Sequence, residues 1–180
     1  MTVPLPPPPN KTPIQQFPDT DGLSWYVAPE TVKQLLALVS AHWENPELAD
    51  SYMNQALAIA GEDLDVLVSA YRYFFYSHNN ALALKVATKV LKMVERMESL
   101  PEDWSPLKPI LSDRPDDPNI RLYINAYAAS GLIRARLGEI EAAKEIAVQV
   151  GEIESRNEFG GNVVRDILAY PNGDDEADEL

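Results

Sequence analysis

Few residues in this sequence have the chemistry of a catalytic or metal site, and the histidines are the first to consider. His42 and His78 are the two imidazoles, and the chain has no cysteine. Without thiols, disulfides, thiolate metal sites and cysteine nucleophiles are excluded. The histidines lack the His-Glu-x-x-His and His-x-x-His spacings of a metal site, and both fall near predicted helix ends, where a histidine commonly contacts terminal carbonyl groups. We expect no catalytic or metal-binding role for either.

The carboxylates form no recognisable site either. Asp113, Asp116 and Asp117 cluster in a proline-rich stretch, but they lack the alternating oxygen ligands, central glycine and terminal glutamate of a calcium loop. The charged run from Glu152 to Glu158 has the pattern of a solvated helix face. A glycine-rich phosphate loop and a Gly-x-Ser-x-Gly elbow are both missing. The sequence therefore predicts no catalytic residue, cofactor or metal, and a protein that is not an enzyme.

The charge of the chain narrows the class of partner. There are 15 basic and 28 acidic residues, so the net charge is -13. A charge of this sign repels phosphate backbones and anionic lipid surfaces, so nucleic acid and membranes are not expected partners. The first residues lack the basic start and apolar run of a signal peptide, and no apolar stretch reaches about 18 residues. A cytoplasmic location is the expectation.

Proline and charge divide the chain into segments. Residues 1–27 are expected to be a proline-rich tail, because the run Pro6 to Pro9 favours an extended conformation. Residues 28–170 have the apolar periodicity of a helical domain, and residues 171–180 form an acidic tail with five acids and no base. Five prolines in residues 101–118 predict an insert through which no regular helix passes. Within it, Trp104 is either buried against the helices or an exposed anchor for a partner.

Apolar spacing and capping residues predict the helices. Asn45, Pro46 and Glu47 have the order of an N-cap, a first-turn proline and a first-turn acid. Connections of a few residues make neighbouring helices antiparallel hairpins. A short final helix around Val163 to Leu168 would cap the open end. The other predicted helices run from Ala28 to Trp43, over 46–60, over 63–78, from Leu82 to Ser99, over 119–137 and over 139–157.

A repeated pattern of small residues links the second helix of each predicted hairpin. Ala49, Ala83 and Ala143 each begin a set of core positions spaced by four and then three residues. The first two sets are 34 residues apart and the last two are 60 apart, and the proline-rich insert accounts for most of the difference. The three sets are Ala49, Met53 and Ala56; Ala83, Ala87 and Val90; and Ala143, Ala147 and Val150.

In these residues the chain resembles the tetratricopeptide repeat family, whose 34-residue unit is a helical hairpin with small residues at the helix contact. The resemblance covers about residues 30–156 and implies a right-handed α-solenoid of about three stacked hairpins with a C-terminal capping helix. Tyr71 departs from the pattern, because that position normally holds a small residue. The third unit matches at Tyr127, Ser130, Gly131, Arg134, Gly138, Ala143, Ala147 and Val150. The second matches at Leu67, Ala70, Tyr71, Phe74, Asn79, Ala83, Ala87 and Val90.

The resemblance also implies a concave surface lined by the first helix of each pair. Aromatic residues and arginines on such a surface favour peptide binding. For Phe75 and Tyr76 the alternative is packing against the neighbouring first helices. The predicted partner-binding residues are Gln34, Leu38, His42, Val68, Arg72, Phe75, Tyr76, Ala128, Leu132 and Arg136.

The expected function is protein–protein interaction, as an adaptor or assembly factor that binds a partner protein or peptide in this groove. A repeat scaffold without catalytic motifs supports that expectation. One alternative is a secretion-type or dedicated chaperone for one client, because such chaperones are also small and acidic. Another is a structural subunit of a larger complex. The sequence leaves the partner and the oligomeric state open.

Overall fold

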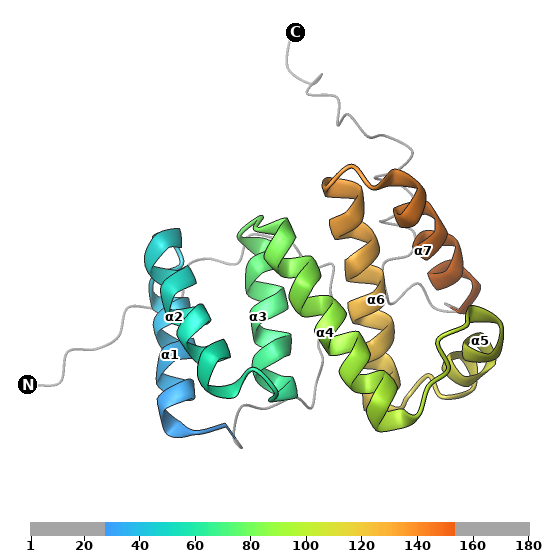
Figure 1. The fold of residues 1–180 in the computed structure, drawn as a ribbon, viewed down its shortest axis with the longest axis horizontal. Helices are drawn as coiled ribbons and strands as arrows, with labels where there is room; N and C mark the ends of the chain where they lie inside the picture. Colours follow the sequence, from blue (N-terminus) through green and yellow to red (C-terminus); the bar gives the residue numbers. More distant parts are fainter. Residues whose placement is uncertain (1–27, 154–180) are drawn as a thin grey trace, which may run out of the picture.

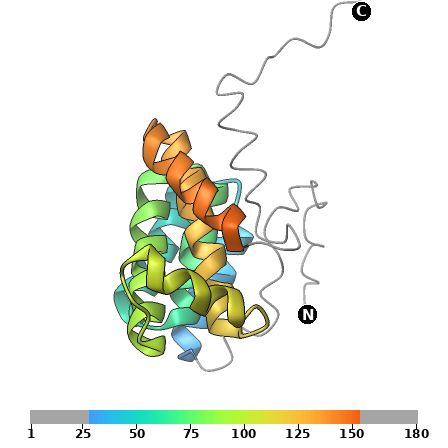
Figure 2. The same ribbon diagram turned by 90° about the vertical axis from the view of Figure 1, so that its right-hand side faces the viewer.

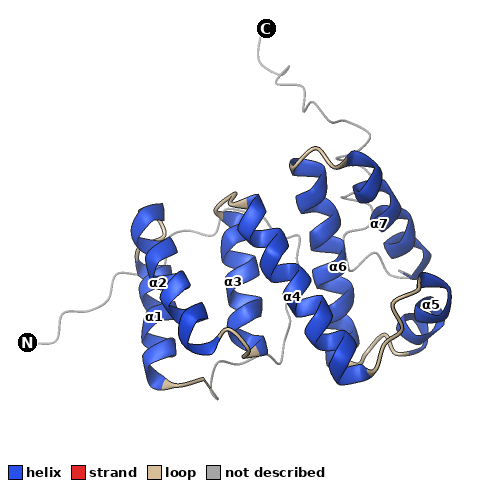
Figure 3. Cartoon of the chain, in the orientation of Figure 1, coloured by secondary structure: helices blue, strands red, loops and turns tan. Residues whose placement is uncertain are grey.

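The computed structural model describes residues 28–153, which fold into α-helices joined by short connections (Figures 1 and 3). No β-strand occurs in that range, so the predicted all-helical class is confirmed there. None of the helices within residues 28–153 is long and apolar enough to cross a membrane. In chain order the helices are α1 (Glu30–Ala41), α2 (Pro46–Ala60), α3 (Leu64–Tyr76), α4 (Asn80–Glu98), α5 (Trp104–Asp113), α6 (Pro118–Arg136) and α7 (Ile140–Ile153).

All the helices predicted before residue 153 are present, and the second has the predicted bounds. Four of them begin after a side chain that accepts hydrogen bonds from backbone amides of the first turn, which otherwise have no partner. These capping side chains are Asn45 for α2, Asp63 for α3, Asn79 for α4 and Asp117 for α6. The predicted tail 1–27, the final helix and the acidic tail 171–180 lie outside the described residues.

The helices pack as pairs in a row (Figure 1). Extensive contacts join α1 to α2, α3 to α4 and α6 to α7, and α4 also packs along α6. Ala49, Ala83 and Ala143 have no accessible surface, as expected for residues at close helix contacts. The predicted burial of the small-residue sets is therefore confirmed, and α4 is shared between two pairs.

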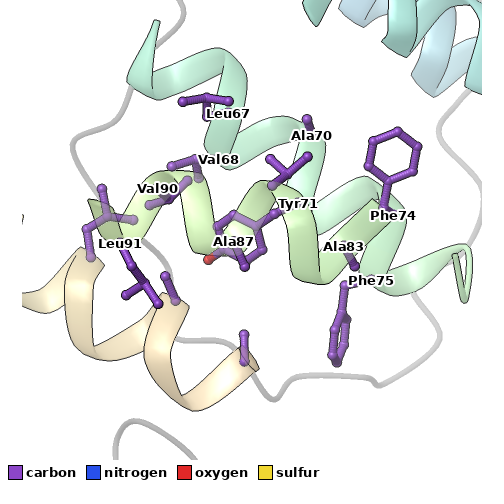
Figure 4. Packing of buried hydrophobic residues seen from close by; sticks show 14 of the residues in the cluster. Leu67, Val68, Ala70, Tyr71, Phe74, Phe75, Ala83, Ala87, Val90 and Leu91 are labelled. Atoms are coloured by element: carbon purple, nitrogen blue, oxygen red, sulfur yellow. The ribbon is translucent and has the colours of Figure 1, made fainter. Parts of the chain in front are cut away.

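The contact between α3 and α4 shows how the small residues work (Figure 4). Ala83 and Ala87 of α4 have no exposed surface, and neither does Phe74 of α3. Tyr71, the bulky residue at a position where the repeat pattern has a small one, is 1% exposed, and burial raises its pKa to about 12. The ring therefore replaces a small residue without leaving the core.

The expectation that no regular helix passes through residues 101–118 is wrong, because α5 spans Trp104–Asp113. Pro106 falls in the first turn, where amides have no partner within the helix. Pro109 lies inside the helix and removes one backbone hydrogen bond. Leu107 and Leu111 are buried, and apolar burial offsets that loss. Figures 1 and 2 both place α5 beside the end of α7, which it contacts.

A polar cluster ties the end of the insert to its neighbours. The Arg114 guanidinium contacts the carboxylates of Glu98 and Asp117, both at 2.6 Å. The Asn119 amide also donates to Glu98, at 2.6 Å. The hydrogen bonds from Asn119 and Arg114 lower the pKa of Glu98, and Arg114 likewise lowers that of Asp117. The end of α4, the insert and the start of α6 are thus joined by one set of charges.

Enlarging the alanine between α3 and α4 is expected to destabilise the fold. In Ala83→Leu the added carbons have no space, and overpacking of this kind costs about 1–3 kcal/mol. Urea denaturation measures the change, with Ala81→Leu as control because Ala81 is exposed on the same helix. Equal stability of the two variants would contradict a close contact at Ala83.

The Glu98 cluster predicts a pH-dependent contribution to stability. The pKa of Glu98 is lower in the folded chain than in the unfolded chain, so the unfolded chain binds more protons. The ionised Glu98 carboxylate therefore stabilises the fold above the ordinary carboxylate pKa. This stabilisation is lost as the pH falls through the folded pKa. The stability difference between wild type and Glu98→Gln should shrink from about pH 7 to about pH 3. Urea midpoints at several pH values measure it, and Glu44→Gln, at an exposed glutamate, is the control. A difference independent of pH would contradict the prediction.

Candidate partner-binding site

The predicted partner-binding residues divide into accessible and buried groups. Gln34, Leu38 and Arg136 are exposed, and His42, Arg72 and Tyr76 are half-buried. The remaining members, Val68, Phe75, Ala128 and Leu132, are buried.

Burial of these four corrects the prediction that they line an open groove. The helix α3 is enclosed on most sides, with eight of its 13 residues buried, and Val68 and Phe75 belong to that core. Leu132 joins the same core from α6, and Ala128 packs with Ile146 and Val150 of α7. The spacing of residues along a single helix predicts which of them share a face, but it does not show that neighbouring helices cover part of that face.

Phe75 joins α3 to α6 through Arg136. The guanidinium carbon of Arg136 lies 4.1 Å from the centre of the Phe75 ring, and Nη1 donates to the Phe75 carbonyl oxygen at 3.2 Å. Stacking of a cation on a ring is favourable, and more so when the cation is partly desolvated. Although the residue as a whole is exposed, desolvation lowers the pKa of the Arg136 guanidinium. The alternative that Phe75 packs against another first helix is confirmed by this contact.

Tyr76 and Arg72 lie one turn apart on α3. The Tyr76 ring meets the Phe75 ring edge-on, with 5.3 Å between centroids. Burial raises the pKa of the Tyr76 hydroxyl, and the nearby Arg72 charge partly opposes that shift. The hydroxyl therefore stays protonated at neutral pH.

Asn125 is a polar residue that the sequence analysis did not select. It is 3% exposed, and its Oδ1 atom is buried without a hydrogen-bond partner. On one side of α6, Tyr123 forms a hydrogen bond to α4 and Tyr127 forms one to α7. Asn125, Leu132 and Arg136 are spaced by seven and four residues, so they share another side of the helix. Arg136 shows that this side borders α3.

We name the α3–α6 face as the surface at Arg72, Tyr76 and Arg136, together with the buried Asn125 and Leu132 on the same side of α6 as Arg136. The sequence signal for Asn125 was a polar amide among apolar residues, on a side of the helix that also carries an arginine. That signal could not distinguish a solvated asparagine from a buried one, because its burial depends on packing.

The α1 end carries a separate aromatic group. His42 Nδ1 donates to the Leu38 carbonyl at 2.9 Å, as expected for a histidine at a helix end, and its ring lies 5.5 Å from that of Tyr52 on α2. Trp43 is 43% exposed and meets the Tyr73 ring edge-on at 5.5 Å. The His42 ring thus lies against α2, whereas the sequence analysis predicted that it lines the concave surface of the first helices.

Trp104 lies between its two predicted alternatives, because it is half-buried. Its ring stacks on Tyr127 at 6.3 Å, and Tyr127 stacks on Tyr123 at 6.0 Å. The indole Nε1 donates to a Glu152 carboxylate oxygen at 3.0 Å, and Lys108 contacts the same oxygen at 3.1 Å. The indole therefore joins the insert to α6 and α7.

The aspartates of the insert have a structural arrangement. Asp117 caps α6 by accepting from the amides of Asn119 and Ile120, at 2.9 and 3.2 Å. Asp113 and Asp116 are exposed. Across residues 28–153, no three histidine, aspartate or glutamate side chains gather in a way that could hold a metal ion.

Comparisons with known proteins show similarity to a bacterial protein. No protein-family model matches the chain, and no solved structure matches it. The uncharacterized 19.8 kDa protein in the nifW 5′ region of Azotobacter chroococcum mcd 1 is 30% identical over 125 residues, which is 67% of this chain and 70% of that protein. At this identity and coverage, the chain belongs to the same family as the nifW-region protein of Azotobacter chroococcum.

Proposed function

We propose that the chain is a protein–protein interaction module, an adaptor or assembly factor, that binds an extended segment of a partner protein on the α3–α6 face. The proposal includes a tetratricopeptide-like arrangement of the helices. Three helix pairs support that arrangement, as do the fully buried alanines at equivalent positions of α2, α4 and α7. Repeat scaffolds of this type use the surface of their stacked helices for binding.

The observation that carries the proposal is the unpaired Oδ1 atom of Asn125. A buried acceptor without a donor costs about 1–3 kcal/mol, so the stability of the fold does not explain its presence. Because the atom has no accessible surface in the free protein, a backbone N–H of a bound segment would supply the missing donor only where binding opens the packing around it. Arg136, about three turns further along the same helix, would offer a partly desolvated cation to an acidic side chain.

The alternative of a structural subunit has less support. That function predicts an exposed apolar patch on the second helices of the pairs. Ile59, Met97 and Val148 are exposed there, on α2, α4 and α7, but they occupy non-equivalent positions of the three repeats. Single exposed apolar residues of this kind are common on soluble proteins.

Gene position suggests where a partner could be sought. The Azotobacter relative is named for its place 5′ of nifW. The products of genes that neighbour the gene of this chain, with the nifW product among them where it is present, are therefore the first partners to test.

Replacing Asn125 is expected to separate stability from binding. Asn125→Leu removes the unpaired acceptor, so it should raise the unfolding free energy by about 1 kcal/mol and weaken partner capture from native cells. Asn80→Leu is the matched control, because Asn80 also has a buried Oδ1 without a partner but lies at the start of α4. Urea denaturation and quantitative mass spectrometry give the two readouts. Undiminished capture by Asn125→Leu would contradict the assigned role of Asn125.

A charge reversal on α3 tests the face independently. Arg72→Glu with Tyr76→Ala should lose the partner that wild type retains, because it inverts a cation and removes a hydroxyl. Lys144→Glu with Val148→Ala makes the same charge change at exposed positions of α7 and should retain it. Circular dichroism establishes that both variants are folded. A partner held equally by both variants would place the interface elsewhere.

A further inference from the structure

Trp43 differs from the other exposed apolar side chains of the described residues. Six large apolar side chains are exposed in residues 28–153, and Trp43, at 43%, is the aromatic one among them. It lies in the connection between α1 and α2, the pair at one end of the row of helices (Figure 1). Tryptophan is enriched among the residues that dominate binding energy, because its ring buries a large area with few rotatable bonds. An exposed tryptophan at this connection therefore calls for a partner that covers it.

The Trp43 ring is held in place by its neighbours. It meets the Tyr73 ring edge-on, with 5.5 Å between centroids, and Tyr73 is 6% exposed. The Tyr73 hydroxyl in turn donates to Asp50 Oδ1 at 2.6 Å, which joins α3 to α2. A side chain that is already positioned loses little conformational freedom on binding, so more of its contact energy contributes to affinity.

The chain around Trp43 is acidic and has no basic side chain to balance it. Residues 34–71 contain six carboxylates and neither lysine nor arginine, and Glu44 and Glu47 follow Trp43 directly in the sequence. Both glutamates are exposed, and no described residue forms a salt bridge with either. Several glutamates of α4 and α7, by contrast, are paired with lysine or arginine. The α1–α2 connection therefore presents unpaired negative charge beside an aromatic ring.

An aromatic face beside unpaired carboxylates has the chemistry that binds an organic cation. A lysine ammonium or an arginine guanidinium is attracted to the face of an aromatic ring, most strongly to that of tryptophan. Neighbouring carboxylates add a charge attraction and accept the N–H groups of the cation. A metal ion is a poor fit, because no three acidic or histidine side chains of residues 28–153 gather in a way that could hold one.

We propose that Trp43, Glu44 and Glu47 form a second interaction site, the Trp43 site, which binds a lysine- or arginine-containing segment of a partner protein. The cation packs on the indole ring, and the two carboxylates accept its hydrogen bonds. The site requires no residue of the α3–α6 face, so this inference does not depend on the proposed function of that face. Its preference is for a basic partner segment.

Titration of the full-length protein with a basic peptide tests the site. The probe is the peptide Gly-Lys-Gly-Arg-Gly-Lys-Gly with both ends blocked, followed by NMR of isotope-labelled protein. The indole signal of Trp43 and the amide signals of Glu44 and Glu47 should shift together as the peptide is added. The same peptide with glutamine in place of each lysine and arginine should leave them unchanged. Unmoved Trp43 signals, or shifts spread evenly over all acidic residues, would overturn the proposal.

Paired variants separate the site from the general negative charge of the chain. At physiological ionic strength Glu44→Gln with Glu47→Gln should weaken peptide binding roughly fivefold. Asp113→Asn with Asp116→Asn is the matched control, because it removes two exposed carboxylates at the other end of the row, where α5 lies (Figure 1). Equal weakening by the two pairs would mean that the peptide responds to net charge alone, and would overturn the proposal.

Variants of the ring test its part in the site. Trp43→Ala should weaken peptide binding roughly fivefold, and Trp43→Phe, which keeps an aromatic face, should bind more tightly than Trp43→Ala. Urea denaturation establishes that each variant is folded, and the phenylalanine variant serves if the alanine variant is not. Equal affinity of the wild type and both variants would contradict a role for the ring. Sedimentation velocity covers the other occupant, since a dimer of the wild type that Trp43→Ala abolishes would assign the ring to a second copy of this chain and overturn the proposal.

Discussion

Close approach of two helices at a single alanine is the contact on which each pair depends. Ala49, Ala83 and Ala143 have no accessible surface, so a larger side chain at any of them would separate its helices. Each pair still has more apolar surface than it can bury internally, and α4 covers α3 on one side and α6 on the other. The positions of α3 and α6, and thus the α3–α6 face, follow from these contacts.

The insert between the second and third pairs is accommodated without loss of this packing. Its helix α5 buries Leu107 and Leu111, and Trp104 stacks on Tyr127 of α6. At the other end, Arg114 joins the insert to Glu98 of α4. Because both ends of the insert are fixed to helices that contact each other, α4 and α6 pack side by side although the chain between them is long.

The α3–α6 face combines one contact that stabilises the fold with one polar group that does not. Arg136 stacks on the Phe75 ring, which is favourable, whereas Asn125 has a buried acceptor without a donor. The missing hydrogen bond is a cost in the free protein. The relative from Azotobacter chroococcum is uncharacterized, so the proposed function rests on this local arrangement.

The sequence by itself determined the helical elements, because apolar spacing and capping residues such as Asn45 and Asp117 act locally. It also identified the buried alanine sets, since each set has the same internal spacing of four and then three residues. The tertiary structure alone decided that α5 forms despite Pro109, because burial of its leucines offsets a lost hydrogen bond. Only the tertiary structure shows that Phe75 and Leu132 are buried and that the Asn125 oxygen has no hydrogen-bond donor. Residues distant in sequence determine which side of a helix remains in contact with water.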